Sequence, residues 1–187
     1  MNHPQVTDCV KRWIRDIVIQ LNLCPFAYNV YRKGLIRYVV SEATNERMLI
    51  QDFLKELQII HTFPPKDVDT TLLIHPYVLN DFSEYNNFLG TVDLLLKESG
   101  SDGIVQAASF HPDYQFEDTT FEDEVTNYTN RSPFPIIHLL REDSLENAID
   151  NYPTPNQIPH NNMKNLRELG LPHMEKLLKS ILLDTTS

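Results

Sequence analysis

TTLLIHP, residues 70–76, is a run of β-branched and aliphatic residues that ends in a histidine and a proline. An apolar run of this kind, without the alternation of a half-exposed strand, is typical of a strand whose sheet is covered on both faces. Proline has no N–H for the ladder and keeps the residue before it extended, so we expect the strand to end at His75. The stretch therefore predicts a sheet with helices on both sides.

Strands and helices alternate along the chain around this stretch. Three more strands are predicted from β-branched and aromatic residues: LIRYVVS (35–41), GIVQAASFHP (103–112) and PIIHLLRE (135–142). Apolar residues at three- and four-residue spacing predict helices over residues 6–22, from Thr44 or Asn45 to Ile60, and from Asp81 to Ser99. A short helix capped by Asp143 and two final helices, separated at Gly170 and Pro172, follow the last strand.

This order predicts an α/β fold. Strand-helix-strand units imply right-handed crossovers and parallel strands. We expect one domain over residues 1–187, with a mostly parallel four-stranded sheet covered by helices, an N-terminal helix and two C-terminal helices. The direction of the fourth strand stays open, which leaves a mixed sheet as the alternative, because a long connection precedes that strand.

The composition narrows the class of protein. The chain has 187 residues, 41% of them hydrophobic, and a net charge of -10, which suits a folded globular protein. An acidic chain without a basic block is a poor binder of nucleic acid or of a membrane surface. The N-terminus lacks a signal region, no apolar run approaches a membrane span, and two cysteines are too few for a disulfide framework. We therefore expect a cytoplasmic protein with a small-molecule or protein partner, and the oligomeric state stays open.

A second strand, ASFHP (108–112), ends in the same dipeptide as the first. If both strands run in parallel, His75 and His111 lie at the carboxyl edge of the sheet, where open α/β sheets bind ligands. His138 lies inside the fourth strand and can face the same region. Histidine titrates near neutral pH and can act as general acid, general base or metal ligand. The alternative is that these histidines are hydrogen-bonded caps or satisfied core residues.

The connection over residues 111–134 is long, acidic and rich in aromatic residues. Structureless loops of this length are uncommon in compact domains, so we expect a lid or wall of the pocket. Arg131 can hold a carboxylate or phosphate, supported by Asn130 and by Asp113, although Arg131 and Arg141 can equally cap carbonyl groups.

NLCPFA, residues 22–27, leaves two interpretations of Cys24 open. If Pro25 opens a helix, Cys24 stands at its N-cap, where the thiol pKa falls and the thiolate is favoured. If the apolar neighbours Leu23 and Phe26 shield the sulfur, Cys24 is an inert buried residue, which we favour.

The peptides NLCPFA, TTLLIHP, DFSEYNNFL (81–89), QAASFHPDYQF (106–116) and NRSPFPIIHLLRE (130–142) together resemble a bacterial family, domain of unknown function 1415. The resemblance spans nearly the full length of the chain. It implies a one-domain bacterial cytoplasmic protein and brings no catalytic roles with it.

Three functional hypotheses follow. The first is a small-molecule enzyme in which His75 and His111 transfer protons while Arg131, Asn130, Asp113 and His138 bind an anionic substrate. The second is a metal-dependent enzyme with a histidine-rich site, and the third is a non-catalytic ligand-binding or assembly module. The chain has neither a Walker phosphate loop nor a G-x-G-x-x-G motif, so we expect no nucleotide cofactor, and none of another kind is indicated.

Overall fold

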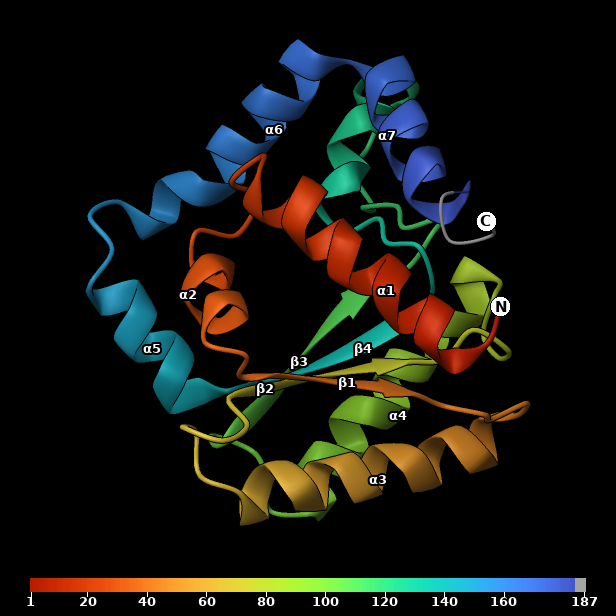
Figure 1. Ribbon diagram of the computed structural model, residues 1–187, viewed down its shortest axis with the longest axis vertical. Helices are drawn as coiled ribbons and strands as arrows, with labels where there is room; N and C mark the ends of the chain where they lie inside the picture. Colours follow the sequence, from red (N-terminus) through yellow and green to blue (C-terminus); the bar gives the residue numbers. More distant parts are fainter. Residues whose placement is uncertain (184–187) are drawn as a thin grey trace.

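The computed structural model describes residues 1–183 and confirms the α/β fold. Its centre is a four-stranded sheet in the order β1-β2-β4-β3 (Figure 1). The strands are β1 (Ile36–Val40), β2 (Thr70–Ile74), β3 (Val105–Phe110) and β4 (Ile136–Arg141).

The sheet is mixed. β1 and β2 pair in parallel, whereas β4 lies between β2 and β3 and runs antiparallel to both. β2 and β3 therefore point the same way without being neighbours. The connection over residues 111–134 returns the chain at the edge where β3 ends, so β4 has to run back in the opposite direction.

Helices cover both faces of the sheet (Figure 1). On one side lie α3 (Glu46–Thr62) and α4 (Phe82–Glu98). The helices on the other side are α1 (His3–Trp13) with the π-helical turn η1 (Ile14–Ile19), α2 (Ala27–Arg32), α5 (Glu142–Asp150), α6 (Ile158–Leu169) and α7 (Leu171–Leu183). Two 3-10 turns, η2 (Phe121–Thr129) and η3 (Pro155–Gln157), complete the described elements.

Side chains at the helix ends explain where these helices begin and end. Asn45 accepts a hydrogen bond from the backbone N–H of Met48, and Asp81 accepts one from Glu84, as expected for N-caps. The first helical segment stops before Asn22, which has a left-handed φ of 53°. Gly170, with a φ of 80°, separates the two C-terminal helices where the sequence predicts a break.

The strands divide the apolar core into two clusters, because successive side chains of a strand point to opposite faces. Leu72, Ile74 and Ile136 pack with Trp13 and the rest of the α1 side. Leu73, Ile137 and Leu139 pack with the buried faces of α3 and α4. We call these the α1 face and the α3/α4 face of the sheet.

Candidate functional site: a cavity on the α1 face

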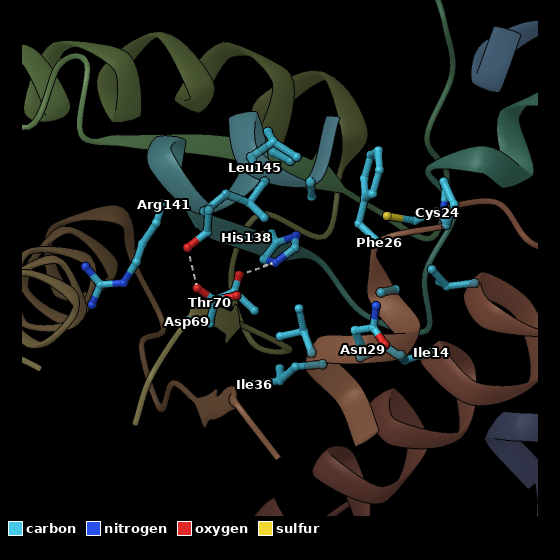
Figure 2. Close-up of a pocket in the computed structure, with 18 of the residues that line it drawn as sticks. Ile14, Cys24, Phe26, Asn29, Ile36, Asp69, Thr70, His138, Arg141 and Leu145 are labelled. Atoms are coloured by element: carbon cyan, nitrogen blue, oxygen red, sulfur yellow. Dashed lines mark hydrogen bonds between the residues drawn. The ribbon is translucent and has the colours of Figure 1, made fainter. Parts of the chain in front are cut away.

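A cavity of about 620 Å³ lies between the α1 face of the sheet and the segments α1, η1, α2 and α5 (Figure 2). Most of its walls are apolar, with side chains including Trp13, Ile14, Val18, Phe26, Ile36, Leu72, Phe110, Leu140 and Leu145. Asn29 of α2, Asn147 of α5 and Asn151 at the C-cap of α5 are exposed and mark the rim. The cavity thus has an apolar interior and a polar entrance between two short helices.

Small side chains and aromatic pairs explain why the space stays open. Ala108 of β3 and Ala148 of α5 line the cavity and fill little of it. Trp13 meets Phe110 edge to face at 5.2 Å between ring centroids, and Phe26 meets Tyr152 at 5.6 Å. The first contact joins α1 to β3, and the second joins the segment before α2 to the segment after α5, so both fix the positions of the cavity walls.

His138 is the polar side chain at the sheet floor of this cavity (Figure 2). It lies on β4 in register with Leu72 of β2 and Ala108 of β3. Its Nε2 is 2.6 Å from the hydroxyl oxygen of Thr70, which also lies 2.6 Å from the carbonyl oxygen of Leu139. Burial lowers the pKa of His138 to about 4, so its imidazole is neutral at neutral pH.

The charged residues at the edge of the cavity are already paired. Asp69 accepts a hydrogen bond from Ser144 at 2.6 Å. Arg141 turns away from His138 (Figure 2) and donates to the carbonyl oxygens of Ile60 and Phe63 at the end of α3 and of Val68 in the loop before β2. Burial lowers the pKa of the Arg141 guanidinium. Arg141 therefore links β4 to the end of α3 by capping carbonyl groups, which is the alternative to anion binding that the sequence analysis names.

Cys24 also lines the cavity, beside Phe26 (Figure 2). The N-cap of α2 is Phe26 and not Cys24, so the N-cap interpretation of Cys24 does not apply. Burial raises the pKa of the Cys24 thiol, which outweighs the lowering by hydrogen bonds from the N–H groups of Phe26 and Ala27. The thiol form is favoured at neutral pH.

His75 and His111 lie at one edge of the sheet, on the α3/α4 face and away from the cavity. Both are fully buried and flank Tyr85, with ring centroids 5.8 and 5.1 Å from it. Nδ1 of His75 donates to the carbonyl of Val78 at 3.0 Å, and Nε2 of His111 donates to that of Leu79 at 3.2 Å. Burial lowers the pKa of His75 to about 4 and lowers that of His111 as well.

The second ring nitrogens of His75 and His111 differ in their hydrogen bonding. Nδ1 of His111 accepts the backbone N–H of Asp113 at 3.0 Å, so both of its ring nitrogens are used. Nε2 of His75 is buried and has no hydrogen-bond partner among the described residues. Neither imidazole lines the cavity on the α1 face. These contacts fit structural histidines, and proton transfer by His75 and His111 stays a prediction.

The connection over residues 111–134 is folded and lies apart from the large cavity. Its turn η2 packs against α6 and α7, with an ion pair of 2.7 Å between Asp123 and Arg167. The lining of the large cavity includes no residue of this connection. The side-chain amide of Asn130 donates to the carbonyl of Ser109 at 3.0 Å, and Asp113 is exposed. Asn130 thereby ties the connection to β3.

Arg131 borders a smaller, more polar hollow of about 300 Å³ within this connection. Its guanidinium donates to the carbonyl of Tyr114 and to Oε1 of Glu124, each at 3.2 Å, and lies over the ring of Tyr128 at 5.1 Å. Glu124 thus already supplies the anionic partner of Arg131. The sequence-predicted group of His75, His111, Arg131, Asn130 and Asp113 shares one end of the molecule, while His138 faces the opposite side of the sheet.

Sequence reasoning did not find the cavity. Thr70 enters the sequence analysis only as the first residue of a predicted strand, and no role is predicted there for Asp69 or Ser144. The available signal was Thr70, Ala108 and His138, three small or polar residues at positions that share one face of the sheet. The walls from α2 and α5 gave no signal, because their placement depends on tertiary packing.

Within residues 1–183, no three His, Cys, Asp or Glu side chains stand together in a way that could hold a metal ion. The helices described in the same range include none with the length and apolar character needed to cross a membrane.

Fold and site together define an α/β protein with a mixed four-stranded sheet, helices on both faces and a cavity beneath the helices of the α1 face. The family model described as protein of unknown function (DUF1415) matches residues 5–176, so the chain belongs to this family. Neither the curated proteins nor the solved structures gave a match to the chain.

Proposed function

We propose that this protein binds a small organic molecule in the cavity on the α1 face. The observation that carries the proposal is the cavity itself, about 620 Å³ of mostly apolar surface with a histidine at its floor. Ligand sites typically measure ~300–1,000 Å³ and combine apolar walls with a few polar groups that orient the ligand.

The packing of the rest of the protein supports this proposal. Protein interiors are close-packed, and voids larger than a water molecule are few. The α3/α4 face follows this rule, with Leu49, Phe53, Tyr85 and Leu139 almost fully buried. The side chains that line the cavity on the α1 face lack van der Waals contacts on one side, and a ligand of matching shape would supply these contacts. The exposed rim between α2 and α5 provides a route of entry.

An enzyme is the second candidate, and His138 favours it. A neutral imidazole on the wall of a ligand cavity can accept a proton from a bound molecule. This candidate retains histidine acid/base chemistry and moves it from His75 and His111 to the side of the sheet that has room for a substrate. Binding is the function we propose first, since catalysis requires it.

Fluorescence of N-phenylnaphthylamine tests the binding proposal, because this neutral apolar dye brightens when water is excluded from it. We expect saturable binding of one dye per chain. In the variant Ala148→Phe, a ring added to the α5 wall fills part of the cavity and should weaken dye binding about tenfold, as expected when apolar contact area is lost. The matched control is Glu146→Phe, which adds the same ring to an exposed position of α5 outside the cavity lining.

The control variant should bind the dye as the wild type does. Dye binding that is absent in the wild type, or equal in Ala148→Phe and Glu146→Phe, would contradict the proposal. Thermal unfolding of both variants shows whether they are folded under the assay conditions.

We also propose that the chain is one domain and that it is cytoplasmic. Both apolar clusters share the same sheet, which supports a common unfolding transition. Cys9 and Cys24 are not joined in a disulfide, as is usual in a reducing compartment. Coincident urea transitions by fluorescence and circular dichroism test the first statement, and cell fractionation tests the second.

A further inference from the structure

The hydrogen bonds around Thr70 determine which nitrogen of His138 carries the proton. The carbonyl of Leu139 can only accept, so the Thr70 hydroxyl donates its one proton to that oxygen across 2.6 Å. The Thr70 oxygen also lies 2.6 Å from Nε2 of His138, and this contact then needs a proton on Nε2. A neutral imidazole has one N–H, so Nδ1 of His138 keeps an unshared electron pair.

This Nδ1 atom is available to a ligand. It has no hydrogen-bond partner in the described part of the chain. His138 is partly exposed, and its ring lines the cavity (Figure 2). Nδ1 is the ring nitrogen that the Thr70 contact leaves unused, so it is the acceptor that this ring offers to a molecule in the cavity.

The charges at the cavity argue against an anionic ligand. Arg141 is the one cationic side chain among the described lining residues, and its guanidinium is committed to the end of α3. Asp69 lies on the same side of the cavity as Arg141 and adds a carboxylate group there (Figure 2). A carboxylate moved into this apolar space would lose its hydration without gaining a free cation.

We propose that the ligand of this cavity is a neutral molecule with an apolar body and one hydroxyl or N–H group, which donates a hydrogen bond to Nδ1 of His138. Thr70 acts as a positioning residue, because its hydroxyl fixes the proton on the opposite nitrogen. The inference rests on the proposed function and adds the chemical class of the ligand.

Three probes of one shape test this class by displacing N-phenylnaphthylamine at neutral pH. They are para-butylphenol, which has a donor, para-butylanisole, whose ether oxygen cannot donate, and para-butylbenzoate, which is an anion. We expect the phenol to bind about fivefold to tenfold more tightly than the anisole, the range of a net hydrogen bond. The benzoate should bind more weakly than both.

The variant His138→Phe supplies the matched control, since it keeps a ring at the site and removes the acceptor. In this variant the phenol and the anisole should bind with the same affinity. The dye carries an N–H group of its own, so it should still bind but with lower affinity than to the wild type. Equal affinities for phenol and anisole in the wild type, or tighter binding of the benzoate, would overturn the inference while leaving cavity binding intact. Failure of the dye and of all three probes would instead overturn the proposed function.

Heteronuclear NMR of the wild-type imidazole provides a measurement that needs no variant. At neutral pH we expect a protonated Nε2 and an unprotonated Nδ1 for His138, and para-butylphenol should shift the Nδ1 resonance. A proton on Nδ1, or an Nδ1 resonance that does not respond to saturating para-butylphenol, would overturn the inference.

Discussion

The two faces of the sheet use the same kinds of residue in opposite ways. On the α3/α4 face, His75 and His111 are fully buried against Tyr85 and hydrogen-bond to nearby carbonyls. On the α1 face, His138 is tied to Thr70 by one nitrogen and presents the other to a cavity of about 620 Å³. A candidate site therefore differs from a structural contact in the open space beside the histidine, and less in whether the histidine ends a strand.

Charged side chains also differ between the α3/α4 face and the edge of the cavity. The α3/α4 face includes a bidentate pair in which Arg37 of β1 donates to the carboxylate of Glu56, which is 2% exposed. At the edge of the cavity, Asp69 accepts a hydrogen bond from Ser144, while the guanidinium of Arg141 extends to carbonyl groups at the end of α3, so the described lining residues leave no free charge in the cavity interior. Substitutions on the α3/α4 face should therefore affect stability, and substitutions on the cavity face should affect binding.

Acid should destabilise the protein through histidines on both faces, and this is the largest effect we expect. His75 and His138 have a pKa near 4 in the folded state, against an ordinary value of 6.5. Between these values the unfolded chain binds protons that the folded chain does not, so the free energy of unfolding falls as pH falls from 6.5 to 4. Each histidine should contribute about 3 kcal/mol over this window.

Urea unfolding at several pH values measures this loss. The variants His75→Gln and His138→Phe should each show a shallower dependence of stability on pH between 6.5 and 4 than the wild type. A wild-type stability that stays constant over this window would show that the two imidazoles are not kept neutral by burial.

Removing Arg37 should be the most damaging single substitution on the α3/α4 face. The variant Arg37→Met leaves the carboxylate of Glu56 buried without its partner, which we expect to lower the free energy of unfolding by about 3 kcal/mol. The double variant Arg37→Met with Glu56→Leu removes both charges and should recover most of this loss. Urea unfolding of the three proteins checks both statements, and a double variant no more stable than Arg37→Met would refute this explanation.

Tyr85 should matter for stability and not for binding. Its hydroxyl donates to the carbonyl of Ile136 at 2.8 Å and accepts the N–H of Phe110 at 3.1 Å, which links β4 to β3. Tyr85→Phe leaves both backbone groups without this partner and should cost about 2 kcal/mol. Dye affinity should be unchanged, because Tyr85 lies on the α3/α4 face. A variant that loses dye affinity while keeping its unfolding midpoint would reverse the assignment of the two faces.

The smallest effect concerns Cys24, whose thiol lines the cavity with a raised pKa. In a Cys9→Ala background, iodoacetamide at neutral pH should label Cys24 about tenfold more slowly than an unstructured peptide thiol, since the thiolate is the reactive form. Saturating para-butylphenol should slow labelling further. Fast labelling that para-butylphenol does not affect would place the sulfur outside the ligand space.

The sequence predicted the fold from patterns that depend on local physics. The run TTLLIHP predicted a buried strand, and Asp81 and Gly170 marked a helix start and a helix break that the structure confirms. The direction of β4 cannot be predicted from the sequence, because the connection over residues 111–134 has no periodic pattern. Its insertion between β2 and β3 is a consequence of long-range pairing that no short segment encodes.

The candidate site was harder to predict than the fold. The repeated His-Pro dipeptide predicts a site at His75 and His111, but a dipeptide contains no information about whether the side chains around it are close-packed or leave a cavity. His138 was counted only as a supporting residue because it lies within a strand. Its partner Thr70 and the small residue Ala108 become informative only when the strand register places them on one face.

Nuclear Overhauser effects between para-butylphenol and the protein methyl groups locate the bound molecule and so distinguish the two faces of the sheet. We predict contacts from the butyl chain or the ring to the methyl groups of Ala108 and Ala148 in the wild type, and a weaker or absent contact to Ala108 in Ala148→Phe. Contacts to methyl groups of the α3/α4 face, such as those of Leu73 or Ile137, would contradict binding in the cavity. Contacts to Thr119 or Thr120, which line the hollow beside Arg131, would also contradict it and would favour a site at the edge of the sheet with His75 and His111.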